Sequence, residues 1–339
     1  MIASTTVARW TWGREDESAD ALTCCLRDLL AAYGVLSVHR LAVGEHTVHI
    51  SVTEAGRART RLFEGEFTVS SEAASRPETV AWLADEVRAG MRTGEVGSVD
   101  ARMACTGVVE RPPHEAQQEE LFSLSASSFA DFVTVALSTR TDAWMPYDLR
   151  GRAQPEVYKA NAPRLAAALD GLAAALGSDT DPDDPTYFGR PTETGIENFY
   201  ESDGAASDVW GSFEIPYRNE VFHHTPRFQD DVYRRSMDGE VLYVPVRDEH
   251  GRVLGYLWAS DAEGAASFEP RIDADDDGYR AGLLWLDRLH VLFQRRLSPS
   301  AALTEASNVP EESGSGRVDP AARPRTVDLI ELRELAAGG

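Results

Sequence analysis

Two hydrophobic periodicities alternate along this chain of 339 residues, and they restrict its fold more than any other feature. Between Ser18 and Gly34, apolar side chains recur every three or four residues, which predicts an amphipathic helix capped by Ser18 and ended by Gly34. From Val48 to Val52, apolar and polar residues alternate instead, as in a half-buried strand. The first third is therefore predicted to contain a strand, this helix, three strands and a second helix that starts near Pro77.

The same two periodicities continue in the rest of the chain. Leucines at helical spacing from Leu165 to Leu176 predict a helix that ends at Gly177. Two strands, Val241 to Val246 and Val253 to Trp258, flank a turn at residues 248–251 and predict a hairpin. The predicted fold class is therefore α+β, with antiparallel sheets packed with helices in two to three small α/β domains.

Three stretches have the composition of linkers, because proline clusters and like charges resist regular structure. They are Glu110 to Glu120, Gly177 to Pro185 and Glu305 to Arg325. They divide the chain into a predicted N-terminal domain, residues 1–110, and a C-terminal α+β domain, residues 120–304, with a sub-boundary near 178–186. Residues 305–339 are predicted to be a linker followed by a short C-terminal helix.

The charge of the chain favours some partners and disfavours others. It carries 56 acidic and 33 basic residues, for a net charge of −23. Such a surface repels nucleic-acid phosphates and anionic lipids, so we predict no nucleic-acid or membrane partner. It attracts cationic proteins, and we expect a basic protein partner. The alternative is that the acidity only keeps the protein soluble.

The basic residues exclude several chemistries. Lys159 is the only lysine, so Schiff-base and P-loop chemistry is not expected. The sequence also lacks a GxSxG elbow, a GxGxxG turn after a strand, an HExxH helix and paired-cysteine zinc spacing. We therefore predict no catalytic residue and no cofactor from the sequence.

Location follows from the cysteines and from the apolar segments. Cys24, Cys25 and Cys105 are odd in number, and two are adjacent, so we predict reduced thiols in the cytoplasm. The N-terminal residues lack the basic start and apolar run of a signal peptide. The best apolar stretch, from Leu165 to Leu176, is too short to span a bilayer and is interrupted by Asp170.

Carboxylates beside aromatic or hydroxyl groups are the candidate binding residues. Aromatic rings near carboxylates can hold cationic groups, although they also serve as ordinary core side chains. Glu193, in a Thr-Glu-Thr-Gly turn, could act as a general base or simply form the turn. The predicted partner-binding residues are Asp142, Trp144, Tyr147, Asp148, Glu193, Asp181, Asp183 and Asp184.

An acidic run resembles half of a calcium loop. Asp273, Asp275, Asp277 and Gly278 match the first half of an EF-hand, in which alternate carboxylates converge on a hard cation. The twelfth position is Leu284, where the family has a bidentate glutamate. We therefore do not expect Ca²⁺ binding, and the alternative is an acidic start to the following helix, where carboxylates favour the helix dipole.

Two resemblances bear on function. The element order of residues 1–110 resembles the small α/β fold of type III secretion chaperone-like proteins, which bind other polypeptides. The acidic, alanine- and arginine-rich chain has the style of actinobacterial toxin-immunity proteins, which are cytoplasmic and non-catalytic. The two resemblances imply an immunity or chaperone-like protein that neutralises or escorts a basic partner such as a toxin. The alternative is a hydrolase-like enzyme with a carboxylate site at Glu193 or at Asp142 and Asp148.

Overall fold

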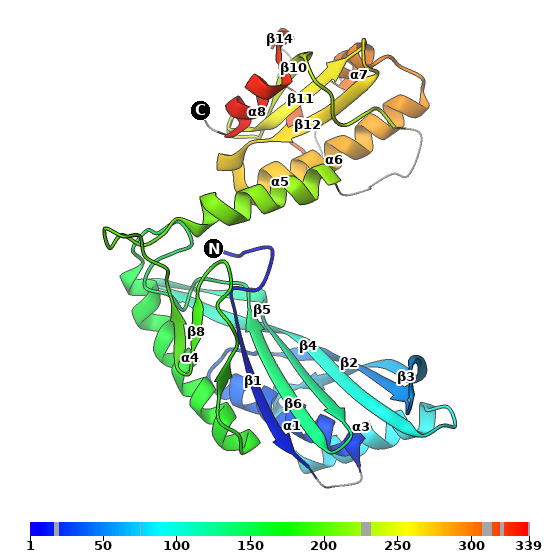
Figure 1. Ribbon diagram of the computed structural model, residues 1–339, viewed down its shortest axis with the longest axis vertical. Helices are drawn as coiled ribbons and strands as arrows, with labels where there is room; N and C mark the ends of the chain where they lie inside the picture. Colours follow the sequence, from blue (N-terminus) through cyan, green and yellow to red (C-terminus); the bar gives the residue numbers. More distant parts are fainter. Residues whose placement is uncertain (17–19, 75, 225–231, 307–313, 319–321, 338–339) are drawn as a thin grey trace. The chain divides into compact units, whose positions relative to one another are not determined.

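The computed structural model describes residues 1–16, 20–74, 76–224, 232–306, 314–318 and 322–337. The chain forms two compact units, residues 1–214 (unit 1) and residues 215–339 (unit 2), which are described separately. Each unit packs helices against an antiparallel sheet, so the predicted α+β class is confirmed (Figure 1).

Unit 1 is built on a seven-stranded antiparallel sheet in the order β3-β2-β4-β5-β6-β1-β7. Its strands are β1 (Ala8–Glu15), β2 (Glu45–Glu54), β3 (Arg57–Ser70), β4 (Val96–Arg111), β5 (His114–Phe129), β6 (Phe132–Thr139) and β7 (Asp181–Pro182). Along each strand buried and exposed side chains alternate, so that Trp10 and Trp12 of β1 are buried while Arg9 is exposed. One face of the sheet therefore carries the core of the unit.

Helices cover that apolar face. They are α1 (Ala21–Val38), α2 (Ser71–Ala74), α3 (Pro77–Gly90) and α4 (Pro155–Leu176). α1 packs on β4, β5 and β6, and α3 and α4 pack beside α1. Gly177 ends α4 in the left-handed conformation, with φ 63°, as its sequence predicts. The remaining elements of unit 1 are β8 (Arg190–Thr192), β9 (Gly195–Glu197) and the π-helix Trp210–Glu214.

α1 is also long and apolar enough to cross a membrane, with a mean hydropathy of 1.5 over its 18 residues. The prediction that the best apolar stretch lies at Leu165–Leu176 is therefore wrong. Ten residues of α1 are buried inside unit 1, among them Leu26, Leu29 and Tyr33. This burial is typical of the core helix of a globular unit.

The predicted linker at Glu110–Glu120 is wrong, and so is the domain boundary placed there. These residues form the end of the β4–β5 hairpin, in which Arg111 is paired with His114 across the turn at Pro112-Pro113. The hairpin extends beyond the covered part of the sheet, so most of residues 114–120 are exposed and can be polar while remaining paired. Part of the second predicted linker, Gly177–Pro185, is also paired, since β7 lies against β1.

Unit 2 has a smaller antiparallel sheet with both faces covered. Its strands are β10 (Glu240–Arg247), β11 (Val253–Ser260), β12 (Ala265–Pro270), β13 (Arg317–Val318) and β14 (Arg325–Asp328), and both β13 and β14 pair with β10. Its helices are α5 (Ile215–His224), the 3-10 turn Ile272–Ala274, α6 (Asp275–Gln294), α7 (Pro299–Ala306) and α8 (Leu329–Ala337). The β10–β11 hairpin and a short C-terminal helix are confirmed, whereas β13 and β14 occupy part of the predicted linker Glu305–Arg325.

The two faces of the unit 2 sheet support separate cores. On one face, Phe222, Trp285 and Leu303 from α5, α6 and α7 pack on Val244 and Leu257. On the other face, α8 covers tyrosine and tryptophan side chains of β10 and β11 with Leu329 and Leu332. The C-terminal helix thus docks on its own unit and completes the second core.

Candidate functional sites

Two of the predicted partner-binding residues of unit 1 lie in its interior. Asp142 and Trp144 are each 1% exposed, so the expectation that they form a partner surface is wrong. The Asp142 carboxylate pairs with the amino group of Met1 and accepts a hydrogen bond from the backbone N–H of Leu149 at 3.1 Å. Its role is to hold the loop after β6, because a buried carboxylate must be matched by donors.

The neighbouring predicted residues shape turns. Asp148 is half-buried and accepts hydrogen bonds from the backbone N–H groups of Arg150 and Arg152, each at 2.9 Å. Tyr147 is half-buried against Tyr200, with ring centroids 6.1 Å apart. Such contacts stabilise a local loop.

The other predicted residues of unit 1 are at its surface. Glu193 is exposed in the tight turn between β8 and β9. Asp181 and Asp184 are exposed, and Asp183 lies 3.5 Å from Arg9 in an exposed ion pair beside β7. These carboxylates remain available to a partner, but nothing gathers them around a hollow that the structure shows.

The acidic run of unit 2 is helical. Asp275 and Asp277 lie in the first turn of α6, preceded by Asp273 in a 3-10 turn, so the run does not adopt the open loop of an EF-hand. Asp273 pairs with Arg271 at 2.7 Å, and Asp277 pairs with Arg252 at 2.5 Å. No group of three metal-ligating side chains occurs among the described residues.

A buried carboxylate in unit 2 forms the most developed polar site among the described residues. Glu269 lies near the end of β12, on the face that α8 covers, and is 3% exposed. One oxygen, Oε2, lies 3.3 Å from Nε2 of His223. The other, Oε1, accepts from Nε1 of Trp258 at 3.3 Å and lies 3.4 Å from Nε of Arg333. The partners therefore come from α5, β11 and α8.

A hollow of about 430 Å³ adjoins this carboxylate. It is lined by His223, Glu269 and Arg333 together with Asn219, Arg235 and Ser236, among others. A volume of this size is within the range of small-molecule sites, roughly 300–1,000 Å³. We refer to this group of residues as the Glu269 site.

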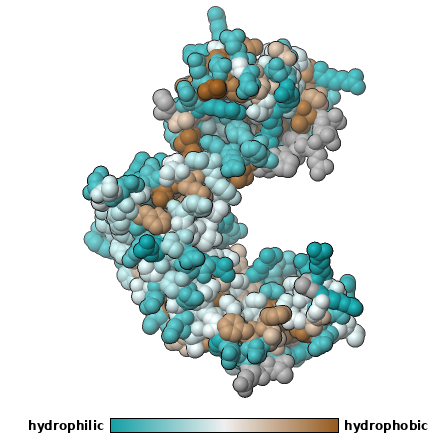
Figure 2. All heavy atoms as spheres, in the orientation of Figure 1, coloured by the Kyte–Doolittle hydropathy of each residue, from teal (hydrophilic) through white to brown (hydrophobic). Residues whose placement is uncertain are grey.

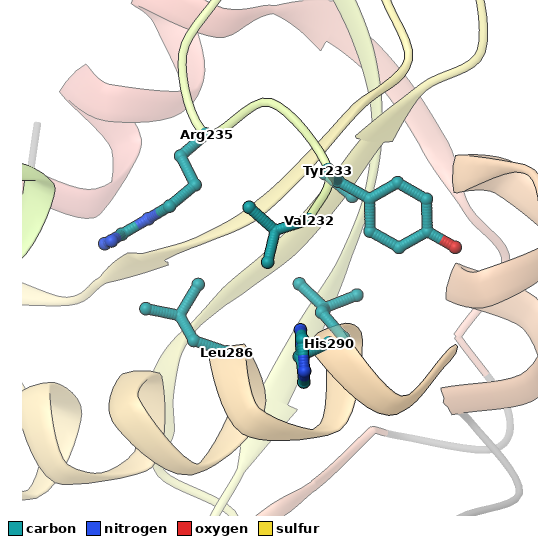
Figure 3. A pocket seen from close by; sticks show the side chains of 7 residues that line it. Val232, Tyr233, Arg235, Leu286 and His290 are labelled. Carbon is teal, nitrogen blue, oxygen red and sulfur yellow. The ribbon is translucent and has the colours of Figure 1, made fainter. Parts of the chain in front are cut away.

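Arg235 links the Glu269 site to the core of unit 2. It also lines a small cavity of about 30 Å³ beside Val232, Leu286 and His290, which has room for water but not for an organic ligand. Figure 3 shows its side chain extending away from these residues. The guanidinium lies over the Phe222 ring at 5.5 Å and donates to the Phe222 carbonyl at 2.5 Å, so α5 holds its charge in place.

This geometry supports binding more directly than nucleophilic catalysis. The Glu269 carboxylate orients the half-buried His223 imidazole, which can then donate or accept a proton. A nucleophile requires a hydrogen bond to that imidazole. Ser236 lines the same hollow, but no hydrogen bond joins it to His223 among the described side chains.

An apolar groove on unit 1 is the second candidate. It has a volume of about 620 Å³ and lies where α1 faces α2 and the start of α3. The groove is lined by Ala31, Gly34, Val35 and Val38 of α1 and by Pro77 and Val80 of α3, among others. The α1 positions lie on one stripe of the helix, and the small side chains at 31 and 34 leave the hollow open. Val38 is 78% exposed. We call this the helix groove.

Sequence reasoning did not find either site. The adjacent His223 and His224 would point to opposite faces if they lay in a strand, which argues against a shared site, but both lie in α5. Residues 223, 269 and 333 are far apart in the sequence and meet only through the tertiary fold. One signal was present, because a glutamate interrupts the largely apolar segment Ala265–Pro270.

Comparisons with protein-family models, curated proteins and solved structures give no match to this chain. The likeness to chaperone-like and immunity-type proteins therefore rests on composition and on the element order predicted for residues 1–110. That order is wrong in one respect, because in the described part of this region only two strands, β2 and β3, lie between α1 and α3, and the next strand, β4, follows α3.

Proposed function

We propose that the protein binds a basic protein partner, as an immunity or chaperone-like protein in the cytoplasm does. The observation that carries this proposal is the helix groove. A soluble unit rarely leaves contiguous apolar residues exposed unless they contact something, and a groove between helices suits an amphipathic segment of a partner. Val38, at the end of the groove, is largely exposed, so its side chain contributes little to the core of unit 1.

The net charge of unit 1 supports a basic partner. The unit contains 34 acidic and 18 basic residues, so its overall field is negative. The charged side chains that line the groove itself are Arg27, which pairs with Asp16 and Asp28 at 2.8 and 2.9 Å, and Arg76 at the start of α3. The apolar floor would therefore hold the apolar side of a partner segment, and the field of the whole unit would attract its basic side.

A crosslinking experiment tests the proposal. A photo-reactive amino acid at Val38 should capture one basic protein in cells of the host, and the same group at Ser123, exposed on the open face of the sheet, should not. Val38→Asp should weaken binding of the captured protein about ten-fold or more, since it places a charge in an apolar contact. Capture of the same proteins from both positions would contradict the proposal.

The matched control is Val291→Asp, which introduces the same charge at a valine of α6 that is 54% exposed. Binding should be unchanged in this variant, and both variants should keep the wild-type melting temperature. Equal loss of binding in the two variants would show that added negative charge, and not the groove, is responsible.

A hydrolase-like enzyme is the second candidate, and the Glu269 site is the observation that favours it. A carboxylate that fixes an imidazole beside a hollow is a common arrangement for proton transfer. If the protein is an enzyme, His223→Gln should abolish turnover of a substrate found by screening esters and amides, while crosslinking at Val38 is unaffected. Turnover that survives His223→Gln would exclude this site as its source.

A further inference from the structure

Unit 2 contains a second hollow on the same face of its sheet as the Glu269 site. It has a volume of about 670 Å³ and is lined by Arg247, Arg323 and Arg325 together with Tyr243, Tyr256 and Leu335, among others. In a chain with 56 acidic and 33 basic residues, none of the described residues that line this hollow carries a carboxylate. The local charge is thus opposite in sign to that of the whole protein.

The sequence places two of these arginines side by side. Arg323-Pro324-Arg325 leads into β14, and proline favours an extended conformation both for itself and for the residue before it. In extended chain, residues two apart point to the same side. Arg325 is paired with Tyr243 across the β10–β14 ladder, so it lies on the face of the two tyrosines.

A further arginine is placed by strand pairing. Arg317 of β13 is directly opposite Arg247 of β10, so their side chains emerge on the same face. Their neighbours Val246 and Val318 belong to the core on the other face. Like charges opposite each other in a sheet are destabilising in the absence of an anion.

Three of these guanidinium groups have no carboxylate partner in the described part of the chain. None of its ion pairs involves Arg317, Arg323 or Arg325, whereas Arg252, Arg271 and Arg295 of the same unit are each paired with a carboxylate. All three unpaired arginines are exposed. We name Arg247, Arg317, Arg323 and Arg325 the arginine cluster.

The floor of the hollow is aromatic and apolar. Tyr243 and Tyr256 are 9% and 5% exposed, and their rings meet edge to face with centroids 5.6 Å apart. Pro245, Val253 and Leu335 extend this floor. A ligand that fits must therefore carry both an anionic group for the arginines and a flat or apolar group for the tyrosines.

We propose that this hollow binds a small organic phosphate that carries an aromatic group, such as a nucleoside diphosphate. Guanidinium groups bind phosphate oxygens through paired, charge-assisted hydrogen bonds, and several converging arginines favour a ligand with more than one negative charge. The inference is independent of the helix groove, which lies in unit 1.

Calorimetric titration of the full chain tests the proposal with ADP and with inorganic pyrophosphate as probes. ADP should bind, and pyrophosphate should bind more weakly because it lacks a group for the tyrosine floor. The variant Arg323→Gln/Arg325→Gln should weaken ADP binding by about ten-fold or more, the effect of losing charged hydrogen bonds. Tighter binding of pyrophosphate than of ADP would overturn the role of the tyrosines.

The matched control is Arg234→Gln/Arg295→Gln, which removes the same charge from two arginines of unit 2 that lie outside the hollow. It should bind ADP within about two-fold of the wild type, as expected for loss of distant, screened charge alone. Absence of binding at millimolar ADP, or equal loss in both variants, would overturn the proposal. So would a glutamate-rich peptide that binds more tightly than ADP and is lost in the cluster variant, because it would indicate an acidic protein as the ligand.

Discussion

The sheet of unit 1 has one apolar face, whereas the sheet of unit 2 has two. In unit 1 most outer positions of β4 and β5 are polar or charged residues, such as Asp100 and Ser127, and no described helix covers them. In unit 2 both faces of β11 are apolar, and all but the first of its eight residues are buried. The stability of unit 2 therefore depends on α8 in a way that has no counterpart in unit 1.

The units also differ in charge. Unit 2 contains 22 acidic and 15 basic residues, so it is much closer to neutral than unit 1. Five of its fifteen arginines line the two hollows on the face that α8 covers. The difference in charge is consistent with the two proposals, in which unit 1 binds a basic protein and unit 2 binds a small anion.

Removing one apolar side chain of α8 gives the largest expected effect. Leu332 is fully buried in the second core, so Leu332→Ala should lower the free energy of unfolding of unit 2 by about 3 kcal/mol. Ile330→Ala on the same helix, where the side chain is 63% exposed, should change it by less than about 0.5 kcal/mol. The measurement is urea unfolding followed by the fluorescence of Trp258 and Trp285, with the other tryptophans replaced in all variants.

Unit 1 should be unaffected by Leu332→Ala. Cys24, Cys25 and Cys105 are all buried in unit 1, and burial raises the pKa of Cys105 to about 12, so thiol labelling reports the opening of this unit alone. Faster labelling in the Leu332 variant would show that the two units unfold together, and the comparison would fail.

A buried histidine gives the second effect, confined to unit 1. Nε2 of His46 accepts from the Thr106 backbone N–H at 2.8 Å, so its Nδ1 carries the proton that the Tyr33 hydroxyl accepts, also at 2.8 Å. His46→Leu removes both hydrogen bonds and leaves the Thr106 N–H without its partner, while the Tyr33 hydroxyl still donates to the Gly44 carbonyl, and it should cost about 2 kcal/mol. His49→Leu, at an exposed position of the same strand, should cost far less. The rate of thiol labelling in urea measures both.

The same histidine makes unit 1 sensitive to acid. Burial lowers the pKa of His46 in the folded state, so as the pH falls through the ordinary histidine range the unfolded chain binds the proton more readily than the folded one. Stability should therefore fall as the pH drops from 7 towards 5, and this part of the decrease should disappear in His46→Leu. If the stability of His46→Leu depends on pH as steeply as that of the wild type, other groups cause the acid sensitivity.

The smallest effect concerns the start of α1. The Asp20 carboxylate accepts from the backbone N–H of Thr23 at 3.2 Å and caps the helix, although the sequence suggested Ser18, which lies outside the described residues. The cap and the pairing with Arg88 lower the pKa of Asp20, as does its hydroxyl contact with Thr23. Asp20→Ala should destabilise unit 1 by about 1 kcal/mol, and Asp85→Ala by less, as measured by labelling.

Local patterns predicted the local structure. The helical spacing in α1 and α4, the ending of α4 at Gly177 and the β10–β11 hairpin depend on neighbours in the sequence, and all are present. The predicted end of the first helix at Gly34 is wrong, because α1 continues to Val38. The composition of Glu110–Glu120 was misleading, because a long hairpin arm tolerates charge when its backbone is paired and its side chains meet water. The composition of a segment does not show whether its backbone is paired with another strand.

The sites required information that no single segment holds. Glu269 has its partners on three elements, and the arginine cluster depends on which edge of β10 receives β13 and β14. Conversely, Asp142 is a charged residue of the kind usually found at a surface, but it is buried, and its carboxylate accepts a hydrogen bond from the loop that it stabilises. A carboxylate in a sequence does not reveal whether its donors are water or protein.

The position of β14 and α8 has a consequence for synthesis. Among the elements of unit 2 they are translated last, yet α8 covers one face of the sheet, and β14, with the short β13, covers one edge of β10, the first of its strands. Until then the nascent sheet presents Tyr243, Tyr256 and Trp258 to solvent or to a ribosome-associated chaperone. In unit 1 the first strand, β1, also waits for its neighbours β6 and β7, but that sheet is complete once β7 has emerged, before any strand of unit 2 is translated. The two units therefore mature at different times, the acidic one first.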